Sequence, residues 1–595
     1  MIRNLSPSPL SLAAILISVV FCPADSTDWE KARDFWSFKP PVQASVPQAQ
    51  RAGWARGDID RFILSGMESA GLVPAGQADR RILARRVFYD LSGLPPTAEQ
   101  ADAFASDMRP DAFEQLVDRL LEAPTFGERL ASIWLNIARY AEDQAHQVGN
   151  DKKFFYPHAH RYRQWVISAF NNDLSYDRFI RLQLAADTMG EQGKDDLAAL
   201  GFLGLGPQYY NRGRLDVMAE EWEDAVDVVS RGFMALTVAC ARCHQHKYDP
   251  FTVHDYYALA GIFASTQVDK RKIKFADGSQ GEAHLVKEGK VRNLPVFRRG
   301  NVEDKGEEVP RRFLEVLAGP QPQPFAGGGS GRDELARMIA DPNNPLTARV
   351  MVNRLWKMIF GSGLVATTSN FGRLGARPTH PELLDHLALR FMEDGWSIKN
   401  LLRQMVLSST YRQSSFVSEQ KRLRDEGNQW LSFMERRRLT AEMLRDSLLM
   451  ASGELEHGDS GKGSKDVDDS SNLRRTVYSR ISRKELDSFL AMFDYPDPNV
   501  HVSHRDQTVT PAQKLFMLNS PFVIERAGKV ASSLPGESMS GKIERAYRMI
   551  LSRGTQDNEL EAALGFFGEN QNAGHEDWTR FVQTLMMSNE FLFRD

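Results

Sequence analysis

Apolar residues recur along most of this chain at the spacing of helices that bury one face. Between 111 and 122 they fall three or four residues apart and Pro124 follows as a stop, which predicts a helix there. The stretch 347–360 has the same pattern, and shorter stretches at 134–141, 162–170 and 578–589 resemble it. The predicted buried positions of the two longer helices are Phe113, Leu116, Val117, Leu120 and Leu121, and Ala348, Val352, Leu355, Trp356 and Ile359.

The helical period fades between residues 267 and 331. A Pro-Gln-Pro-Gln-Pro run at 320–324 and a Gly-rich run at 327–331 are typical of a linker. Short strands are expected at Val296 in this connector and at 475–481 in the C-terminal half. The predicted fold class is therefore mainly α, with two helical domains and a few short strands in the connecting region and the C-terminal half.

This pattern divides the chain into segments. We expect a signal peptide, an extended lead-in, a first helical domain, an irregular connector and a second helical domain, at 1–26, 27–57, 58–268, 269–331 and 332–595. A chain of 595 residues is also too long for one ordinary core, which favours at least two domains.

Composition and charge exclude several classes of protein. Hydrophobic residues make up 42% of the chain and charged residues 26%, which is too apolar for general disorder. A formal net charge of -4 argues against nucleic acid as a partner. The basic runs at 270–274 and 436–438 are interpreted as solvated faces.

The N-terminus predicts export. Arg3 precedes an apolar run from Leu10 to Phe21, which is too short to span a bilayer and fits the hydrophobic region of a signal peptide. Small residues near Ala24 suit cleavage there, so the mature protein would be periplasmic or extracellular. Cleavage would remove Cys22 and leave the chain with two cysteines, and no later stretch is apolar enough for a transmembrane span.

Those two cysteines lie in Cys240-Ala-Arg-Cys243-His244, the pattern for covalent attachment of a c-type haem. A stripe of apolar residues predicts one helix over 218–244, with both thiols continuing its buried face and His244 beside them as proximal iron ligand. The positions of this stripe are Trp222, Val226, Val229, Phe233, Leu236, Cys240 and Cys243. His246 and His254 are further candidates for the cofactor site.

Other interpretations of the cysteine pair remain open. The thiols are either small buried side chains, a redox dithiol, or ligands of zinc or iron together with His244 and His246. A zinc site usually has a second, distant pair of ligands, which this chain lacks. The pairs His158–His160 and His501–His504 also offer imidazoles for a sixth iron ligand or a general base.

The motif and its surroundings resemble a known family, the planctomycete cytochrome C-type domain of unknown function. The resemblance rests on Thr237-Val-Ala-Cys-Ala-Arg-Cys-His-Gln-His-Lys-Tyr-Asp-Pro250, and upstream on Asp90-Leu-Ser-Gly-Leu-Pro-Pro96 and Trp134-Leu-Asn-Ile-Ala-Arg-Tyr140. The second half resembles the companion planctomycete-specific domain, through Asn344-Pro-Leu-Thr-Ala-Arg-Val-Met-Val-Asn-Arg354, Asn370-Phe-Gly372 and Ser409-Thr-Tyr-Arg-Gln-Ser414.

The resemblance implies an exported protein with a cytochrome-like haem motif, and it supplies no reaction. Many relatives carry a further cytochrome c-like domain in front, so here a separate electron-transfer protein is the expected partner. Relatives commonly have Asp where this chain has Gln245, which weakens an acid–base or metal role at that position.

Three hypotheses follow. The first is a haem-binding redox protein that transfers electrons or oxidises an extracytoplasmic substrate such as a carbohydrate. The second is a metal-dependent non-haem enzyme that acts on exported polymers. The third is a non-catalytic interaction protein in which the Cys-x-x-Cys-His motif is structural.

Overall fold

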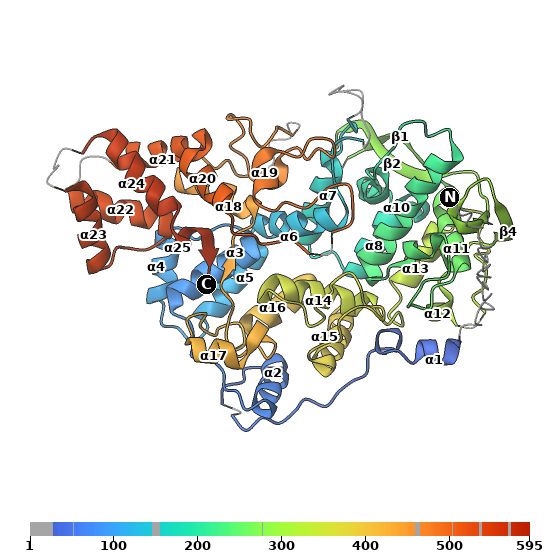
Figure 1. The fold of residues 1–595 in the computed structure, drawn as a ribbon, viewed down its shortest axis with the longest axis horizontal. Helices are drawn as coiled ribbons and strands as arrows, with labels where there is room; N and C mark the ends of the chain where they lie inside the picture. Colours follow the sequence, from blue (N-terminus) through green and yellow to red (C-terminus); the bar gives the residue numbers. More distant parts are fainter. Residues whose placement is uncertain are drawn as a thin grey trace, which may run out of the picture.

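The structure is a computed structural model that describes residues 28–595 except 52, 145–154, 276–277, 320, 459–463, 503, 535–537 and 569–572. The predicted signal peptide, including Cys22, lies outside the described residues. Among those described, α-helices dominate and strands form only short two-stranded sheets (Figure 1). The predicted mainly α fold class is confirmed.

Helices make up nearly all of the regular structure before residue 265. Four of these helices, α1, α3, α4 and α11, begin with a side-chain cap. In α11, Thr252 and Asp255 form a capping box. The predicted helix at 111–122 is confirmed as α5, and its five predicted apolar positions are buried. The bounds are α1 Trp29–Arg33, α2 Asp58–Ser69, α3 Arg80–Ser92, α4 Ala98–Ser106, α5 Ala112–Glu122, α6 Pro124–Ile137, α7 His160–Asn171, α8 Tyr176–Ala185, α9 Gly201–Gly204, α10 Leu215–Met234 and α11 Val253–Ala264.

The connector carries two antiparallel β-hairpins. Strands β1 (Thr266–Lys274) and β2 (Gln280–Glu288) pair over their full length, and β3 (Leu294–Phe297) pairs with β4 (Lys305–Val309). The strand expected at Val296 is therefore confirmed as β3. One helical turn, α12 (Glu315–Ala318), completes this region.

The C-terminal half returns to helices. The helix predicted at 347–360 is confirmed as α14. The bounds are α13 Arg332–Ile339, α14 Thr347–Phe360, α15 Pro381–Glu393, α16 Ile398–Leu407, α17 Glu419–Arg424, β5 Arg437–Arg438, α18 Ala441–Ala451, α19 Ser488–Met492, α20 Pro511–Asn519, α21 Pro521–Ser532, α22 Met539–Leu551, α23 Asp557–Phe567, α24 His575–Met586, α25 Asn589–Leu592 and β6 Phe593–Arg594.

One expected strand is wrong. The segment 475–481 contains a 3-10 turn, η9 (Thr476–Tyr478), in place of a strand. Its first residue is held by a side chain: Asp446 on α18 accepts hydrogen bonds from the Thr476 backbone N–H at 2.8 Å and from its hydroxyl at 2.6 Å. A carboxylate thus takes the backbone donor that a neighbouring strand would otherwise have paired.

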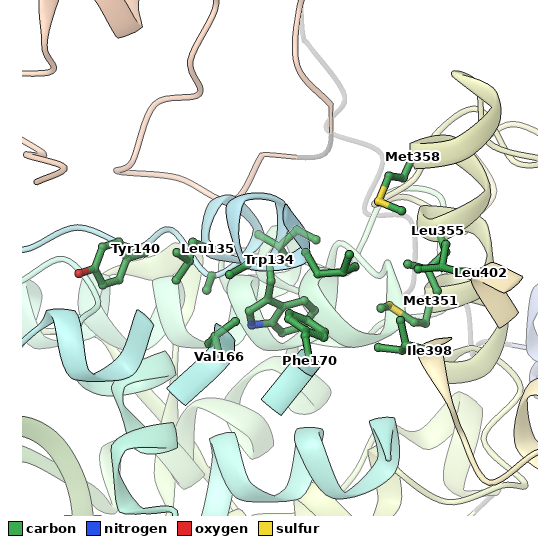
Figure 2. Close-up of a cluster of buried hydrophobic side chains, with 14 of the residues drawn as sticks. Trp134, Leu135, Tyr140, Val166, Phe170, Met351, Leu355, Met358, Ile398 and Leu402 are labelled. Carbon is green, nitrogen blue, oxygen red and sulfur yellow. The ribbon is translucent and has the colours of Figure 1, made fainter. Parts of the chain in front are cut away.

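Buried hydrophobic side chains form one continuous cluster from Phe38 to Leu592. Figure 2 shows part of it, where Trp134 of α6 lies beside Phe170 of α7, with Met351 of α14 and Leu402 of α16 close by. Helices from the two halves therefore share a core, and α13 packs on α8 and α16 on α5 in the same way.

A buried ion-pair triad joins the two halves. Arg475 lies 2.6 Å from Glu128 on α6 and 3.0 Å from Asp446 on α18, and all three side chains are at most 5% exposed. The Tyr478 hydroxyl also donates to Glu128 at 2.7 Å. Because a buried charge is costly unless it is paired, this triad fixes how α6 and α18 sit against each other.

None of the described helices is both long and apolar enough to cross a membrane.

We expect Arg475→Met to lower the free energy of unfolding by about 3–5 kcal/mol, because it leaves two buried carboxylates without their cation. Urea unfolding followed by circular dichroism measures this change. Arg580→Met is the control, since Arg580 pairs with Glu576 on an exposed helix face and should change stability by about 0.5 kcal/mol or less. Equal effects of the two substitutions would contradict a structural role for the triad.

Candidate functional site

Helix α10 ends before the cysteine pair. Ala235 follows it in a left-handed conformation with φ 53° and ψ 42°, and its carbonyl accepts a hydrogen bond from Phe371 N–H at 2.8 Å. The Arg354 guanidinium of α14 donates to the carbonyls of Arg231 and Gly232. The helix predicted over 218–244 is therefore wrong beyond residue 234. Leu236 N–H turns back to the Ser230 carbonyl at 3.1 Å, and groups from the C-terminal half satisfy other polar groups at this helix end.

Both cysteines lie on a separate 3-10 turn, η6 (Val238–Arg242), and on its C-cap. Val238 and Ala241 are buried and anchor one side of the turn. Residues three apart lie over one another in a 3-10 helix, so Cys240 and Cys243 share a side, and both are exposed. The expectation that the thiols continue the buried stripe of α10 is wrong, although they do lie on a common side.

The β3–β4 hairpin lies next to Cys243 and supports the cysteine turn. The Tyr257 hydroxyl of α11 lies 3.1 Å from the Arg242 carbonyl and 3.2 Å from that of Phe297, so it ties the turn to β3. Gly300 has φ +76°, and a Cβ there would lie 2.5 Å from Cys243 Sγ. Both the conformation and the close approach require glycine, and the hairpin loop therefore covers one side of Cys243.

The His244 imidazole is exposed and has a defined tautomer. Its Nδ1 lies 2.7 Å from the Gln245 carbonyl oxygen. Because a carbonyl only accepts, Nδ1 carries the proton and Nε2 keeps its lone pair. Iron-ligating histidines are held in the same way, with one nitrogen donating to a carbonyl or carboxylate. His244 thus presents a ligating nitrogen beside the two thiols.

His246 is used by the loop itself. Its Nδ1 accepts a hydrogen bond from Asp249 N–H at 2.8 Å, and its Nε2 lies 3.1 Å from the Thr237 hydroxyl. Burial lowers the pKa of His246, although the nearby Asp249 carboxylate acts to raise it. Both nitrogens are engaged, so His246 closes the loop after the motif and has no nitrogen left for a metal.

Asp249 connects this loop to the C-terminal half. Its carboxylate accepts a hydrogen bond from Arg373 N–H at 2.6 Å and is 5% exposed. A Cβ on Gly372 would overlap this carboxylate, so the approach of the two loops depends on glycine at that position.

The remaining candidate histidines lie in different surroundings. His254, on the first turn of α11, is exposed and pairs with Glu307 at 2.6 Å. His501 is buried between the Ser369 hydroxyl at 2.7 Å and the Ile137 carbonyl at 3.1 Å, and burial lowers its pKa to about 3. His501 is therefore a neutral structural residue. The rings of His158 and His160 lie 5.7 Å apart, and His504 is exposed beside Asp506 at 3.3 Å.

Charged side chains surround the Cys240 thiol. Partial burial raises the pKa of this thiol. Arg231 acts to lower the pKa, whereas Asp227 and Glu223 act to raise it, and the net shift is upward. Cys240 is therefore protonated at neutral pH. This protonation is unfavourable for a redox dithiol, which needs the thiolate.

The motif has the groups that a covalently attached haem needs. Two thiols on one side could form the thioether bonds, and the free Nε2 of His244 could ligate the iron. Glu223 and Asp227 place negative charge near Cys240. In the described part of the chain, no three His, Cys, Asp or Glu side chains converge on a position suited to a bare metal ion.

The sequence alone did not predict the groups that fix the position of the cysteine turn. Arg354 and Gly372 were visible only as parts of the second-half resemblance, and nothing in their local sequence indicates a contact with α10 or Asp249. Hydrophobic periodicity does not detect a left-handed residue such as Ala235, and it does not indicate which distant guanidinium will satisfy the carbonyls at a helix end.

Family comparison separates the chain into two parts. Residues 58–268 match PSCyt2, a protein of unknown function (DUF1549), and residues 331–567 match PSD1, a protein of unknown function (DUF1553). The chain contains both domains, in this order. The cysteine turn therefore belongs to the PSCyt2 domain, whereas Arg354 and Gly372, which fix its position, belong to the PSD1 domain. No curated protein and no solved structure matches the chain.

We expect Gly372→Ala to cost about 1–3 kcal/mol in the free energy of unfolding, because the new methyl group must displace the buried Asp249 carboxylate. Chemical denaturation measures the loss, and faster hydrogen exchange of the Asp249 and Arg373 amides would locate it. Gly213→Ala is the matched control, since no atom lies within 4 Å of a Cβ there. A stability equal to that of Gly213→Ala would contradict this contact.

The raised pKa of Cys240 predicts slow alkylation. In a Cys22→Ser, Cys243→Ser background, Glu223→Gln with Asp227→Asn should lower this pKa and increase the iodoacetamide rate near neutral pH several-fold, because a larger fraction is then thiolate. The pH dependence of the rate gives the pKa directly. Glu576→Gln, on an exposed face of α24, should leave the profile unchanged. An unchanged rate in the double variant would contradict this electrostatic account.

Proposed function

We propose that this protein is an exported c-type haem protein that transfers electrons or oxidises a substrate outside the cytoplasm. The Cys240 and Cys243 thiols would form the thioether bonds and His244 would be the proximal iron ligand. The observation that carries the proposal is the His244 tautomer: Nδ1 donates to the Gln245 carbonyl, and Nε2 is left free beside two exposed thiols on the same side of a turn.

Haem bound at this turn would supply a one-electron couple. The chain's own residues would hold and tune it. The Gln245 carbonyl keeps the imidazole oriented, and the support from Tyr257 keeps the turn against β3. The exposed position suits electron exchange with a separate protein partner, because that partner could approach closely.

The raised pKa of Cys240 also disfavours rapid thiol–disulfide chemistry. A protonated Cys240 is protected from rapid disulfide exchange, which requires the thiolate. The metal-dependent alternative finds less support, because His246 has both nitrogens engaged. The structural motif in an interaction protein is the alternative that the experiment below separates from haem attachment.

The test is expression of the full chain in a host with haem-maturation machinery. We expect purified protein to keep a Soret-absorbing chromophore and a haem-sized mass increment after denaturation and acid-acetone washing. Cys240→Ser with Cys243→Ser should lose the covalent haem. His244→Ala should keep it but with a shifted Soret band, because the iron loses its proximal ligand.

His254→Ala is the control for this experiment. His254 lies ten residues after His244 and is exposed, paired with Glu307, so its loss should leave attachment and spectrum unchanged. Protein with no mass beyond its polypeptide would contradict the proposal. Bound zinc or iron without porphyrin would also contradict it and would favour the metal-dependent alternative.

A further inference from the structure

A cavity of about 190 Å³ lies where α6 and α14, near the centre of Figure 1, meet β5 and residues 504–507. Both halves of the chain contribute to its walls. Strand β5 pairs with β6, with Arg437 opposite Arg594 and Arg438 opposite Phe593. The expectation that the basic run 436–438 is a solvated face is therefore wrong for Arg437 and Arg438, which are half-buried and line this cavity.

The wall of the cavity is strongly cationic. Six arginines and one lysine line it, and no aspartate or glutamate does. The seven cations are Arg129, Arg354, Lys357, Arg437, Arg438, Arg505 and Arg594. Such a concentration of one sign of charge in a partly closed site attracts an ion of the opposite sign.

Two carboxylates behind the wall neutralise only some of these cations. Arg505 forms a two-pronged pair with Glu442, with both distances 2.6 Å. Asp90 lies 2.8 Å from Arg594 and 3.4 Å from Arg437. Among the described residues, the other four cations, Arg129, Arg354, Lys357 and Arg438, have no carboxylate within ion-pair distance.

Arg129 is the clearest of these unpaired groups. It is only 9% exposed, and its Nε has no hydrogen-bond partner in the described part of the chain. Burial lowers its pKa to about 10 despite the more distant Asp90 and Glu442. A buried guanidinium of this kind is costly unless a ligand completes its hydrogen bonds.

Lys357 has a similar environment on α14. Burial and the neighbouring charge of Arg354 lower its pKa to about 8. Arg354 itself donates hydrogen bonds to the carbonyls at the end of α10. It therefore adds positive charge near Lys357 and gives Lys357 no partner of opposite charge.

We propose that this cavity binds a small molecule through an oxyanion group, a carboxylate, phosphate or sulfate. Guanidinium groups match the geometry of such groups, and a lysine adds a point charge. Ile133, Met358 and Met443 line the same cavity and suit an apolar part of the ligand. The volume fits a small organic anion or a single charged group of a larger molecule.

The proposal does not depend on haem, because none of its residues lies in the cysteine turn. Isothermal titration of the full chain with sodium sulfate, phosphate and benzoate, at constant ionic strength set with chloride, tests it directly. We expect saturable one-site binding of at least one of these anions, and the preferred anion identifies the oxyanion class. Absence of saturable binding for all three would overturn the proposal.

Variants locate the bound anion. Lys357→Met should weaken binding at least about tenfold, whereas Lys357→Arg keeps the charge and should retain binding. Lys357→Met should also fold, since it removes a buried cation that Arg354 repels. Lys272→Met on the exposed basic run of β1 is the control and should leave affinity unchanged. Equal affinities of Lys357→Met and Lys272→Met would overturn the assignment to this cavity.

Discussion

The position of the cysteine turn follows from the end of α10, where Leu236 N–H returns to the Ser230 carbonyl and the Arg354 guanidinium satisfies carbonyls of the last turn. This guanidinium donates to the carbonyls of Arg231 and Gly232, while Phe371 N–H binds the carbonyl of the left-handed Ala235. A left-handed conformation costs an alanine about 1–2 kcal/mol, and these partners offset that cost. The chain can then leave the buried face of α10 and carry Cys240 to the surface.

The same contacts explain why the motif is open rather than sealed in the core. Had α10 continued, its period would have directed both thiols into the apolar interior. The shorter period of η6 instead buries Val238 and Ala241 and leaves Cys240 and Cys243 exposed. Asp249 and Gly372 hold the following loop, so the PSD1 domain acts as the support on which the PSCyt2 motif is presented.

Buried charged side chains occur in two kinds of cluster in this protein, one fully paired and one with an excess of cations. At the Glu128–Arg475–Asp446 triad every charge has a partner, so the contact between α6 and α18 is well specified. In the cavity between α6 and α14 the cations outnumber their carboxylates, and Arg129 and Lys357 are left unpaired. A site with such an excess is less stable by itself than with an anion bound, which is how binding sites commonly differ from structural ion pairs.

Local pattern in the sequence determined the mainly helical class, the helices α5 and α14, and the chemical identity of the Cys240–Cys243–His244 group. These features depend on residues close together in the chain, whose spacing matches a helix or a ligand motif. Only the tertiary structure decided that α10 ends at residue 234, that 475–481 forms a turn, and that Arg437 and Arg438 face a cavity. Each of these places involves a partner far away in sequence, Arg354, Asp446 or Arg594, and neither hydrophobic period nor local charge indicates which distant side chain will lie there.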